Sequence, residues 1–450
     1  MKKFLVVMVV LAFVGLGSIA AYAADVSVGG SVQIRSRDFN NLDFDKDLHD
    51  NAIDTQERII LNVNAKAGDD LKGKISLWND FSDWGSNFNG FSTDQNFGNG
   101  FGSSTAGYQA DTFGFREAWV SFNIPGIPVS VTAGHQLLQL ANGWFARSMH
   151  FGSDAWVVAN VTGANTIAVV DAIATQSAFA GQGVGTAIVN GVGDVNIAEG
   201  TSYGKIDAYI ILDAFAIDDK NTVGLNVTDV HLGSANDLYN IGIMYNGAAS
   251  IIKWKLEGDF ETGTDKQVAA GAYQPKYKGD QVVLQANAMM DPVTFNLMIG
   301  YGTGNKQPNA SGNNDVDKMV TFLDIDPHYT FLYEYKIDTA AGATHTGMSN
   351  TTVESIGAMW HALKSLDLGA AVYFLQASQK TNVALTGGGA GALATNIGTE
   401  VDLHVNWKLY DNLTWNWDLG WFGPGAVYKD ANGKGTDAAL GVQGVLAFSF

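Results

Sequence analysis

The sequence predicts an all-β fold: a transmembrane antiparallel up-and-down β-barrel of about 18 strands, with 16 and 20 strands as the alternatives. Three observations carry this prediction. Apolar and polar residues alternate with period two along most of the chain, and the connections between the alternating segments are short and long by turns. The chain also begins like an exported protein and ends on an aromatic residue, Phe450. Together they indicate a sheet with hydrocarbon outside, water inside, short periplasmic turns and long outer loops.

The amino-terminal segment has the composition of a secretory signal peptide. Lys2 and Lys3 form a short basic region, residues 4–20 are apolar, and Ala21-Tyr22-Ala23 supplies the small residues of a cleavage site. We therefore expect residues 1–23 to be removed and residues 24–450 to form a single barrel domain. An amino-terminal membrane anchor is the alternative interpretation. No later segment offers the roughly 20 consecutive apolar residues that a spanning helix requires.

Composition excludes several classes of function. The 450 residues include no cysteine, which excludes thiolate metal sites, cysteine nucleophiles, disulfides and covalent haem attachment. Glycine is abundant, with 53 residues against 7 prolines, which suits a sheet with many turns. The formal net charge of −19 argues against nucleic acid as a partner, because phosphate binding requires basic patches.

The alternation identifies the strands one by one and is clearest in residues 251–261. There Ile252, Trp254, Leu256 and Phe260 alternate with Lys253, Lys255, Glu257, Asp259 and Glu261. The same pattern recurs in residues 26–37, 58–67, 293–301, 329–337, 366–374, 401–409, 413–421 and 440–450. A helix would group its charges at three- and four-residue spacing, so period two predicts strands. The pattern is weakest in residues 150–200, where the strand count is least determined.

Two classes of connection separate these strands. The short ones lie at residues 68–70, 125–127, 247–249, 291–292, 363–365 and 410–412. The long ones cover about 39–53, 82–111, 139–152, 176–200, 262–280, 302–318, 339–351, 378–397 and 422–438. Bacterial barrels have short periplasmic turns and long outer loops, so the two classes give each strand its direction. Loop 82–111 is rich in Asn, Gly, Ser and aromatic residues, which suits sugar binding, pore constriction or a plain surface loop.

Aromatic side chains on two predicted strands suggest membrane interfaces. Trp415, Trp417 and Trp421 share the outward face of one strand, and alternate residues from Tyr329 to Tyr335 share the outward face of another. Aromatic girdles mark the two membrane–water boundaries of a barrel. A soluble β-sandwich or β-helix is the alternative, but it would leave the export signal and the two loop classes without an explanation.

Several stretches resemble known outer-membrane barrels. Residues 440–450 (LGVQGVLAFSF) resemble their closing strand, which implies recognition by the barrel-assembly machinery through Phe450. Residues 397–425 (IGTEVDLHVNWKLYDNLTWNWDLGWFGPG) are similar to the late strands of the alginate-export-type family, and residues 58–66 (RIILNVNAK) with 77–80 (LWND) resemble its early hairpin. Gly134-His135-Gln136 stands where that family has Gly-Arg-Gln. The resemblance implies a monomeric, porin-like barrel whose polar lumen passes a small solute or a polyanionic sugar.

The predicted lumen faces carry charges of both signs, and these are the candidate selectivity residues. Arg35, Arg37 and Arg58 fall on the predicted lumen face and would form one basic patch. The other charged candidates are Lys253, Lys255, Glu257, Asp259, Glu400 and Asp402. Such a mixed lining predicts a porin for passive diffusion of small hydrophilic solutes or ions, because charges along a pore select what passes. A conduit for an acidic sugar or polysaccharide and a non-transporting structural or adhesive barrel are the alternatives.

Signals for metal binding and catalysis are weak. Asp43, Asp45, Asp47 and Asp54 have the spacing of a calcium loop, but Leu48 stands where such a loop requires glycine, so a solvated acidic loop is the plainer interpretation. No nucleophile elbow, zinc-protease motif or P-loop is present, and no enzyme activity or cofactor is expected. The expected partners are outer-membrane lipid, lipopolysaccharide, the assembly machinery and a small hydrophilic solute.

Overall fold

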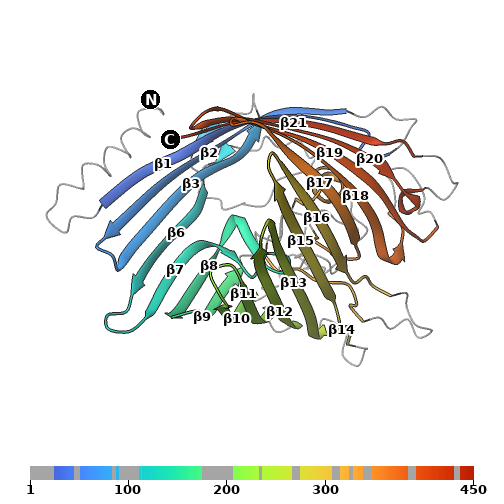
Figure 1. Ribbon diagram of the computed structural model, residues 1–450. Helices are drawn as coiled ribbons and strands as arrows, with labels where there is room; N and C mark the ends of the chain where they lie inside the picture. Colours follow the sequence, from blue (N-terminus) through green and yellow to red (C-terminus); the bar gives the residue numbers. More distant parts are fainter. Residues whose placement is uncertain are drawn as a thin grey trace.

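The strands of the computed structural model form one closed barrel (Figure 1). The structure describes residues 25–44, 51–83, 88–90, 111–112, 114–174, 206–232, 236–265, 274–306, 315–323, 328–337, 346–383, 392–429 and 436–450. Each wall strand pairs in antiparallel fashion with the strands before and after it in the chain. The last strand pairs with the first, with Ser31 opposite Ser449 and Asn40 opposite Leu440. These pairings confirm the predicted all-β barrel.

Eighteen strands build the wall among the described residues. The first nine are β1 (Asp25–Asn40), β2 (Asn51–Ala67), β3 (Leu71–Asp83), β6 (Gly114–Asn123), β7 (Val129–Gln139), β8 (Arg147–Thr162), β9 (Asn165–Ala174), β10 (Ile206–Ala216) and β11 (Thr222–Leu232). The others are β12 (Asn236–Ala249), β13 (Ile252–Asp265), β15 (Asp280–Met290), β16 (Val293–Gly302), β17 (Thr352–Leu363), β18 (Leu366–Thr381), β19 (Ala394–Tyr410), β20 (Leu413–Pro424) and β21 (Ala439–Ser449). The weakly patterned stretch 150–200 contributes to β8 and β9.

Small elements complete the described part of the chain. They are β4 (Phe88–Gly90), β5 (Asp111–Thr112), β14 (Lys276–Tyr277), the one-turn helix α2 (Tyr333–Lys336) and the 3₁₀ turn η2 (Ala426–Tyr428). Strands β4 and β5 pair in parallel, and β14 pairs with the end of β13. Within the described residues, no helix is both long and apolar enough to cross a membrane.

The outward face of the wall is apolar, and the strand register shows how this arises. One row of paired residues runs from β8 to β13 through Val158, Val169, Ile211, Val227, Ile241 and Phe260. Each of these side chains is between 40% and 59% exposed, so the row presents hydrocarbon to the surroundings of the barrel. Trp415, Trp417 and Trp421 are also exposed on the outward face of β20, where the alternation predicts them. An outward apolar band with aromatic side chains is the pattern of a membrane barrel.

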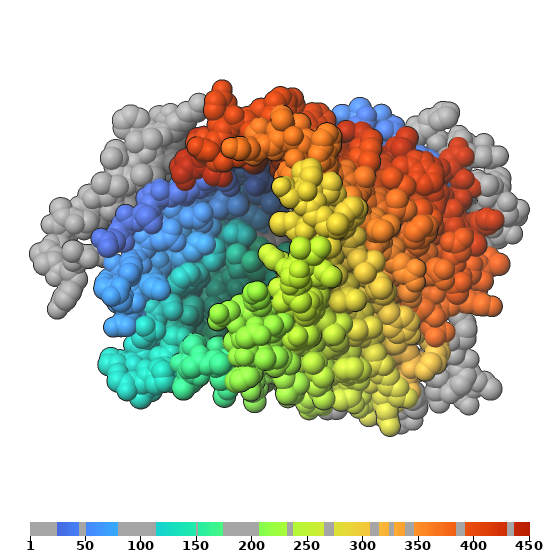
Figure 2. Space-filling model, viewed as in Figure 1, coloured from blue at the N-terminus to red at the C-terminus, as the bar shows by residue number. Residues whose placement is uncertain are grey.

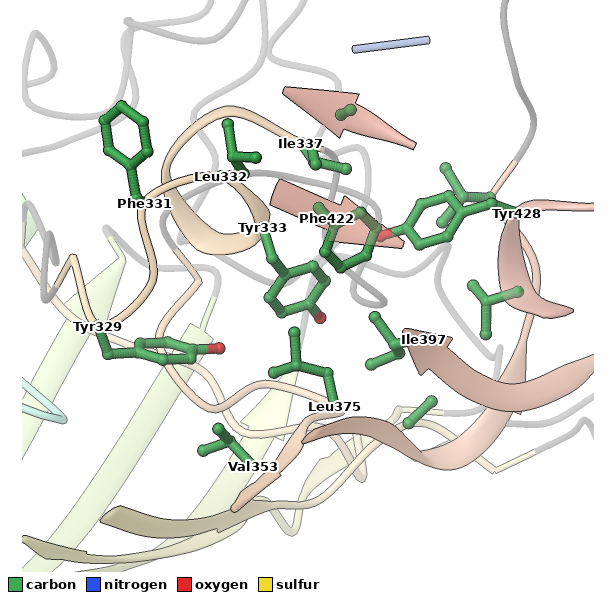
Figure 3. Packing of buried hydrophobic residues seen from close by; sticks show 14 of the residues in the cluster. Tyr329, Phe331, Leu332, Tyr333, Ile337, Val353, Leu375, Ile397, Phe422 and Tyr428 are labelled. Atoms are coloured by element: carbon green, nitrogen blue, oxygen red, sulfur yellow. The ribbon is translucent and has the colours of Figure 1, made fainter. Parts of the chain in front are cut away.

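Buried apolar side chains gather inside the barrel, where chain segments between the strands fold inward. Figure 3 shows one such cluster around α2, in which Tyr333 lies against Leu375 and Phe422 of the wall. The stacked rings of Tyr333 and Phe422 lie 6.1 Å apart between centroids. Residues of the inward segments and of the wall strands both contribute to these clusters, so the inward segments pack against apolar positions of the wall.

The strand predicted for residues 329–337 is wrong, and with it the second aromatic girdle. Residues 329–337 are irregular apart from α2 and belong to one long connection, 303–351, between β16 and β17. Phe331 and Tyr333 are 9% and 0% exposed, inside the barrel rather than on its outer face. Their backbone N–H groups donate to carboxylates of the wall and not to a neighbouring strand. Aromatic residues at every second position therefore occur here in a buried irregular segment, because such spacing is not unique to strands.

Candidate functional site in the barrel lumen

Two chain segments meet inside the barrel and narrow its lumen. The first inward segment is residues 140–146, between β7 and β8; the second is the described part of residues 316–337, between β16 and β17. The Phe322 N–H donates to the Phe145 carbonyl at 2.8 Å, and the two rings stack with centroids 6.4 Å apart. Figure 2 shows this face of the molecule hollowed beside the strands coloured blue and teal. The inward segments thus form one body inside the barrel.

Carboxylates on β13 hold both inward segments. Glu257 accepts the backbone N–H groups of Asn142 at 2.5 Å, Trp144 at 3.1 Å and Phe145 at 3.3 Å. Glu261 accepts the N–H of Val320 at 3.1 Å. Asp259 lies between Glu257 and Glu261 on the same face of the strand. All three carboxylates are 7% exposed or less. Alternate residues of a strand share a face, which places the three acids in one line along the wall.

Between these two anchors, Asp259 bonds within the wall. It accepts a hydrogen bond from the Gln281 side chain of β15 at 2.9 Å. Gln281 stands opposite Asp259 in the register of β13 and β15, so the bond joins directly paired residues. Asp259 therefore connects neighbouring strands, whereas Glu257 and Glu261 connect the wall to the inward segments.

A second pair of acids on β19 holds α2 from another part of the wall. Glu400 accepts the N–H groups of Leu332 at 2.5 Å and Tyr333 at 2.9 Å, and Asp402 accepts that of Phe331 at 3.2 Å. Both acids are 1% exposed or less. In the order of the sheet, four strands separate β13 from β19. The second inward segment is therefore fixed to two distant parts of the barrel.

Basic side chains from β1, β2, β6 and α2 gather around the rings of Trp78 and Phe39. Arg58 and Arg116 lie over Trp78, at 5.6 Å and 5.8 Å from the ring centroid. Arg37 and Lys336 lie over Phe39, at 5.9 Å and 5.3 Å. Arg35 donates to the Tyr335 hydroxyl at 3.1 Å and to Gln56 at 2.5 Å. Arg35, Arg37, Arg58, Arg116 and Lys336 make up the basic patch, in which aromatic faces stabilise the cations.

The structure brings some predicted candidates together and separates others. Arg35, Arg37 and Arg58 join one patch, as the alternation suggests, although Arg37 also pairs with Asp54 at 2.5 Å. Lys253 and Lys255 lie exposed on β13, on the same face as the acids but nearer the short turn before that strand. Glu257, Asp259, Glu400 and Asp402 are covered. A role of these residues in ion selectivity stays a prediction.

The calcium candidate can be compared with the structure only in part. Asp45 and Asp47 lie outside the described residues, as does most of loop 82–111. Asp54 lies on β2, where both carboxylate oxygens accept hydrogen bonds from Arg37. Within the described ranges, no group of three or more histidine, aspartate or glutamate side chains is arranged to hold a metal ion.

Glu261 on β13 and four residues at the basic patch were absent from the candidates chosen by sequence. Arg116, Trp78, Tyr335 and Lys336 contribute to the basic patch. Trp78 lies on β3, which pairs with β2 and its Arg58, and Arg116 lies on β6, which pairs with β3. One signal was available: Trp144 and Phe145 are apolar residues in an outer loop expected to be polar. An apolar run there indicates a segment that folds inward, since exposed apolar residues gain by burial.

A buried lysine on the second inward segment gives a pH-dependent prediction. Lys318 is 9% exposed, and burial lowers the pKa of its ammonium group to about 8 from the ordinary 10.5. Between these values the opened segment binds more protons than the packed one, so raising the pH stabilises the packed state. We expect the Val320 amide, corrected for intrinsic exchange, to become better protected from hydrogen exchange between about pH 8 and about pH 10. The Lys318→Met variant should lose this pH dependence. A variant whose Val320 protection still rises over the same pH range would contradict the prediction.

Comparison with known proteins extends the description of the fold. No protein-family model and no curated protein matches the chain. Among solved structures it is similar to OccK8 (OprE) of Pseudomonas aeruginosa, with 8% identity over 95% of this chain and 98% of that one and a TM-score of 0.55. A BenF-like porin from Pseudomonas fluorescens Pf-5 shows 9% identity over 96% and 100% and a TM-score of 0.55. Pseudomonas aeruginosa OccK2 (OpdF), solved in complex with glucuronate, shows 9% identity over 95% and 96% and a TM-score of 0.53. The chain thus has the barrel fold of these proteins over nearly its whole length.

Proposed function

We propose that the chain is an outer-membrane channel through which small hydrophilic solutes or ions diffuse passively. The observation that carries this proposal is the closed barrel with an apolar outward face and two inward segments that narrow its lumen. Closure leaves no unpaired sheet edge in lipid, so the wall is suited to a membrane and the lumen to water. The barrel fold shared with porins supports the same function.

The remaining features fit this location. Residues 1–23 would act as the export signal, and the short turns would face the periplasm while the long connections face outward, in contact with lipopolysaccharide. Phe450, 59% exposed beside β1, would be read by the barrel-assembly machinery. No enzyme activity is proposed, because catalysis is not needed for diffusion through a preformed lumen.

Single-channel conductance of the refolded mature protein in a planar bilayer tests the proposal. Discrete openings with a reversal potential in a salt gradient would establish a channel and report its charge preference. A correctly folded, heat-modifiable barrel that inserts but never conducts would overturn the proposal. That outcome would favour the alternative of a structural or adhesive barrel.

The basic patch supports a second candidate function, passage of an acidic sugar or polysaccharide of the alginate-export type. Arg58, Arg116 and Lys336 are partly exposed cations on one side of the lumen that can attract carboxylates, whereas Arg35 and Arg37 are only 6% and 5% exposed. Arginine pairs with carboxylates in bidentate fashion. The similar barrel OccK2 (OpdF) was solved with glucuronate, an acidic sugar. Blockade of the ion current by glucuronate, and none by glucose, would favour this candidate.

Removing the predicted arginines should change charge preference. We expect the variant in which Arg35, Arg37 and Arg58 are all replaced by Gln to shift its reversal potential toward cation preference. The reason is that three fixed positive charges leave one side of the lumen while its acids remain. The control replaces Lys220 and Lys364, which lie in exposed turns outside the strands, by Gln. Equal shifts in both variants would show that overall charge, and not the patch, sets the preference.

A further inference from the structure

We propose that Glu257, Glu261, Glu400 and Asp402 are positioning residues that set the bore of the channel by holding the two inward segments against the wall. The inference rests on the proposed function, since a bore matters only if solutes pass. It assigns these lumen carboxylates a mechanical role: they fix the position of other chain segments, and the permeating solute meets those segments and not the acids.

The first argument is the destination of the backbone hydrogen bonds. An inward segment that forms neither helix nor sheet must satisfy its N–H groups elsewhere, because unpaired buried N–H groups are costly. Glu257 receives three of them, Glu261 one, Glu400 two and Asp402 one. The donors include consecutive residues in both segments, such as Leu332 and Tyr333. Glu257 and Glu400 therefore each fix a short run of backbone, and Glu261 and Asp402 each fix one further backbone N–H group.

The second argument is burial. None of the four acids takes part in an ion pair within the described residues. Their exposures of 7% or less keep them from the water of the lumen. A buried polar group left without a hydrogen bond destabilises the fold, so the backbone N–H groups of the inward segments supply bonds that water would otherwise make. The acids and the inward segments therefore hold each other in place.

The third argument is that the anchored segments act together. The Phe145–Phe322 contact joins the first to the second, and the Trp144 and Tyr329 rings lie 5.9 Å apart between centroids. At its far end the second segment reaches the basic patch, where Arg35 donates to Tyr335. The body is consequently held from β13, from β19 and from β1. Loss of one acid should therefore loosen the joined inward segments at the strand that carried this acid, while their contacts with the other strands remain.

The test compares truncation with the conservative change at two anchors. Single-channel records and exclusion of graded polyethylene glycols are measured for Glu400→Ala, Glu400→Gln, Glu257→Ala and Glu257→Gln. We expect the Ala variants to admit larger polymers and to enter larger-conductance substates about tenfold more often, because the acceptor of two or three backbone N–H groups is lost. The Gln variants retain one acceptor oxygen and should fall between wild type and Ala. Reversal potentials should change little in all four.

Glu354 provides the matched control. It lies exposed on β17 in register with Ile299 and Phe374, which are 45% and 53% exposed on the outward face. Glu354→Ala and Glu354→Gln should leave polymer exclusion and substates unchanged. Heat-modifiability on gels confirms that each barrel is folded before it is measured, and the Gln variants keep the test decisive if an Ala variant fails to fold.

Two outcomes separate the inference from the proposed function. If the wild type conducts but Ala and Gln variants shift the reversal potential equally, with polymer exclusion unchanged, the acids are selectivity charges and the inference is wrong. If wild type and variants conduct identically by every measure, it is wrong as well. A wild type that never conducts overturns the proposed function itself.

Discussion

Replacing residues 305–349 by a short glycine–serine turn is expected to raise single-channel conductance several-fold. These residues contain α2 and the second inward segment, which lie in the lumen with Leu332 and Tyr333 fully buried. The wall would stay closed because β16 and β17 pair directly from Val293 with Trp360 to Tyr301 with Thr352. Removing the segment therefore widens the lumen without opening the sheet.

The measurement is conductance together with polymer exclusion, on protein whose folded state is confirmed by heat-modifiability. As a control, an equal glycine–serine turn is inserted after Asp411, in the exposed turn between β19 and β20. Its conductance should match that of the wild type. If the shortened variant folds and conducts like wild type, the inward segments do not constrict the path, and the pore must be narrowed elsewhere.

Substituting Gly30 with valine should impair closure of the barrel at the seam between β1 and β21. Gly30 and Phe450 exchange backbone hydrogen bonds at 3.0 and 3.1 Å where the first and last strands meet. A Cβ at Gly30 would lie 2.3 Å from the Ile60 carbonyl oxygen and 2.9 Å from the Phe450 ring. One of these neighbours must move, and overpacking of this kind costs about 1–3 kcal/mol.

The expected result is a lower urea midpoint and a lower yield of the heat-modifiable form for Gly30→Val. Gly73→Val is the matched control, because a Cβ there would meet the Trp119 carbonyl oxygen at 3.4 Å, an ordinary contact. A Gly30→Val barrel as stable as the Gly73→Val barrel would show that the seam adjusts without cost. Phe450→Ala would then distinguish loss of the covering ring from strain in the strand.

The wall could be read from the sequence because a strand in a barrel has one wet and one dry face. Alternation such as that from Ile252 to Glu261 fixes which side chains point inward, and the register follows from pairing neighbouring strands. The segment from Tyr329 to Ile337 shows the limit of the method. Its alternate aromatics face a buried interior on several sides, so the pattern carries no information about the partner of its backbone.

For the site, the sequence predicted which face of the strand each acid lies on, but not its partners. The sequence placed Glu257, Glu400 and Asp402 on the inner face, because facing depends only on strand period. It could not show that their partners are N–H groups from residues 68 to 115 positions away, since such contacts depend on how long connections fold. The pairing of Arg58 with Trp78 across β2 and β3 is likewise a matter of side-chain direction and not of spacing.

The anchored body between β13, β19 and β1 also bears on the rigidity of the wall. The hydrogen bonds to Glu257 and Glu400 and the contact of Tyr335 with Arg35 connect separated arcs of the circumference through the interior. The same residues that narrow the passage thus act as an internal brace, so the cross-section of the barrel and the size of its opening are expected to change together.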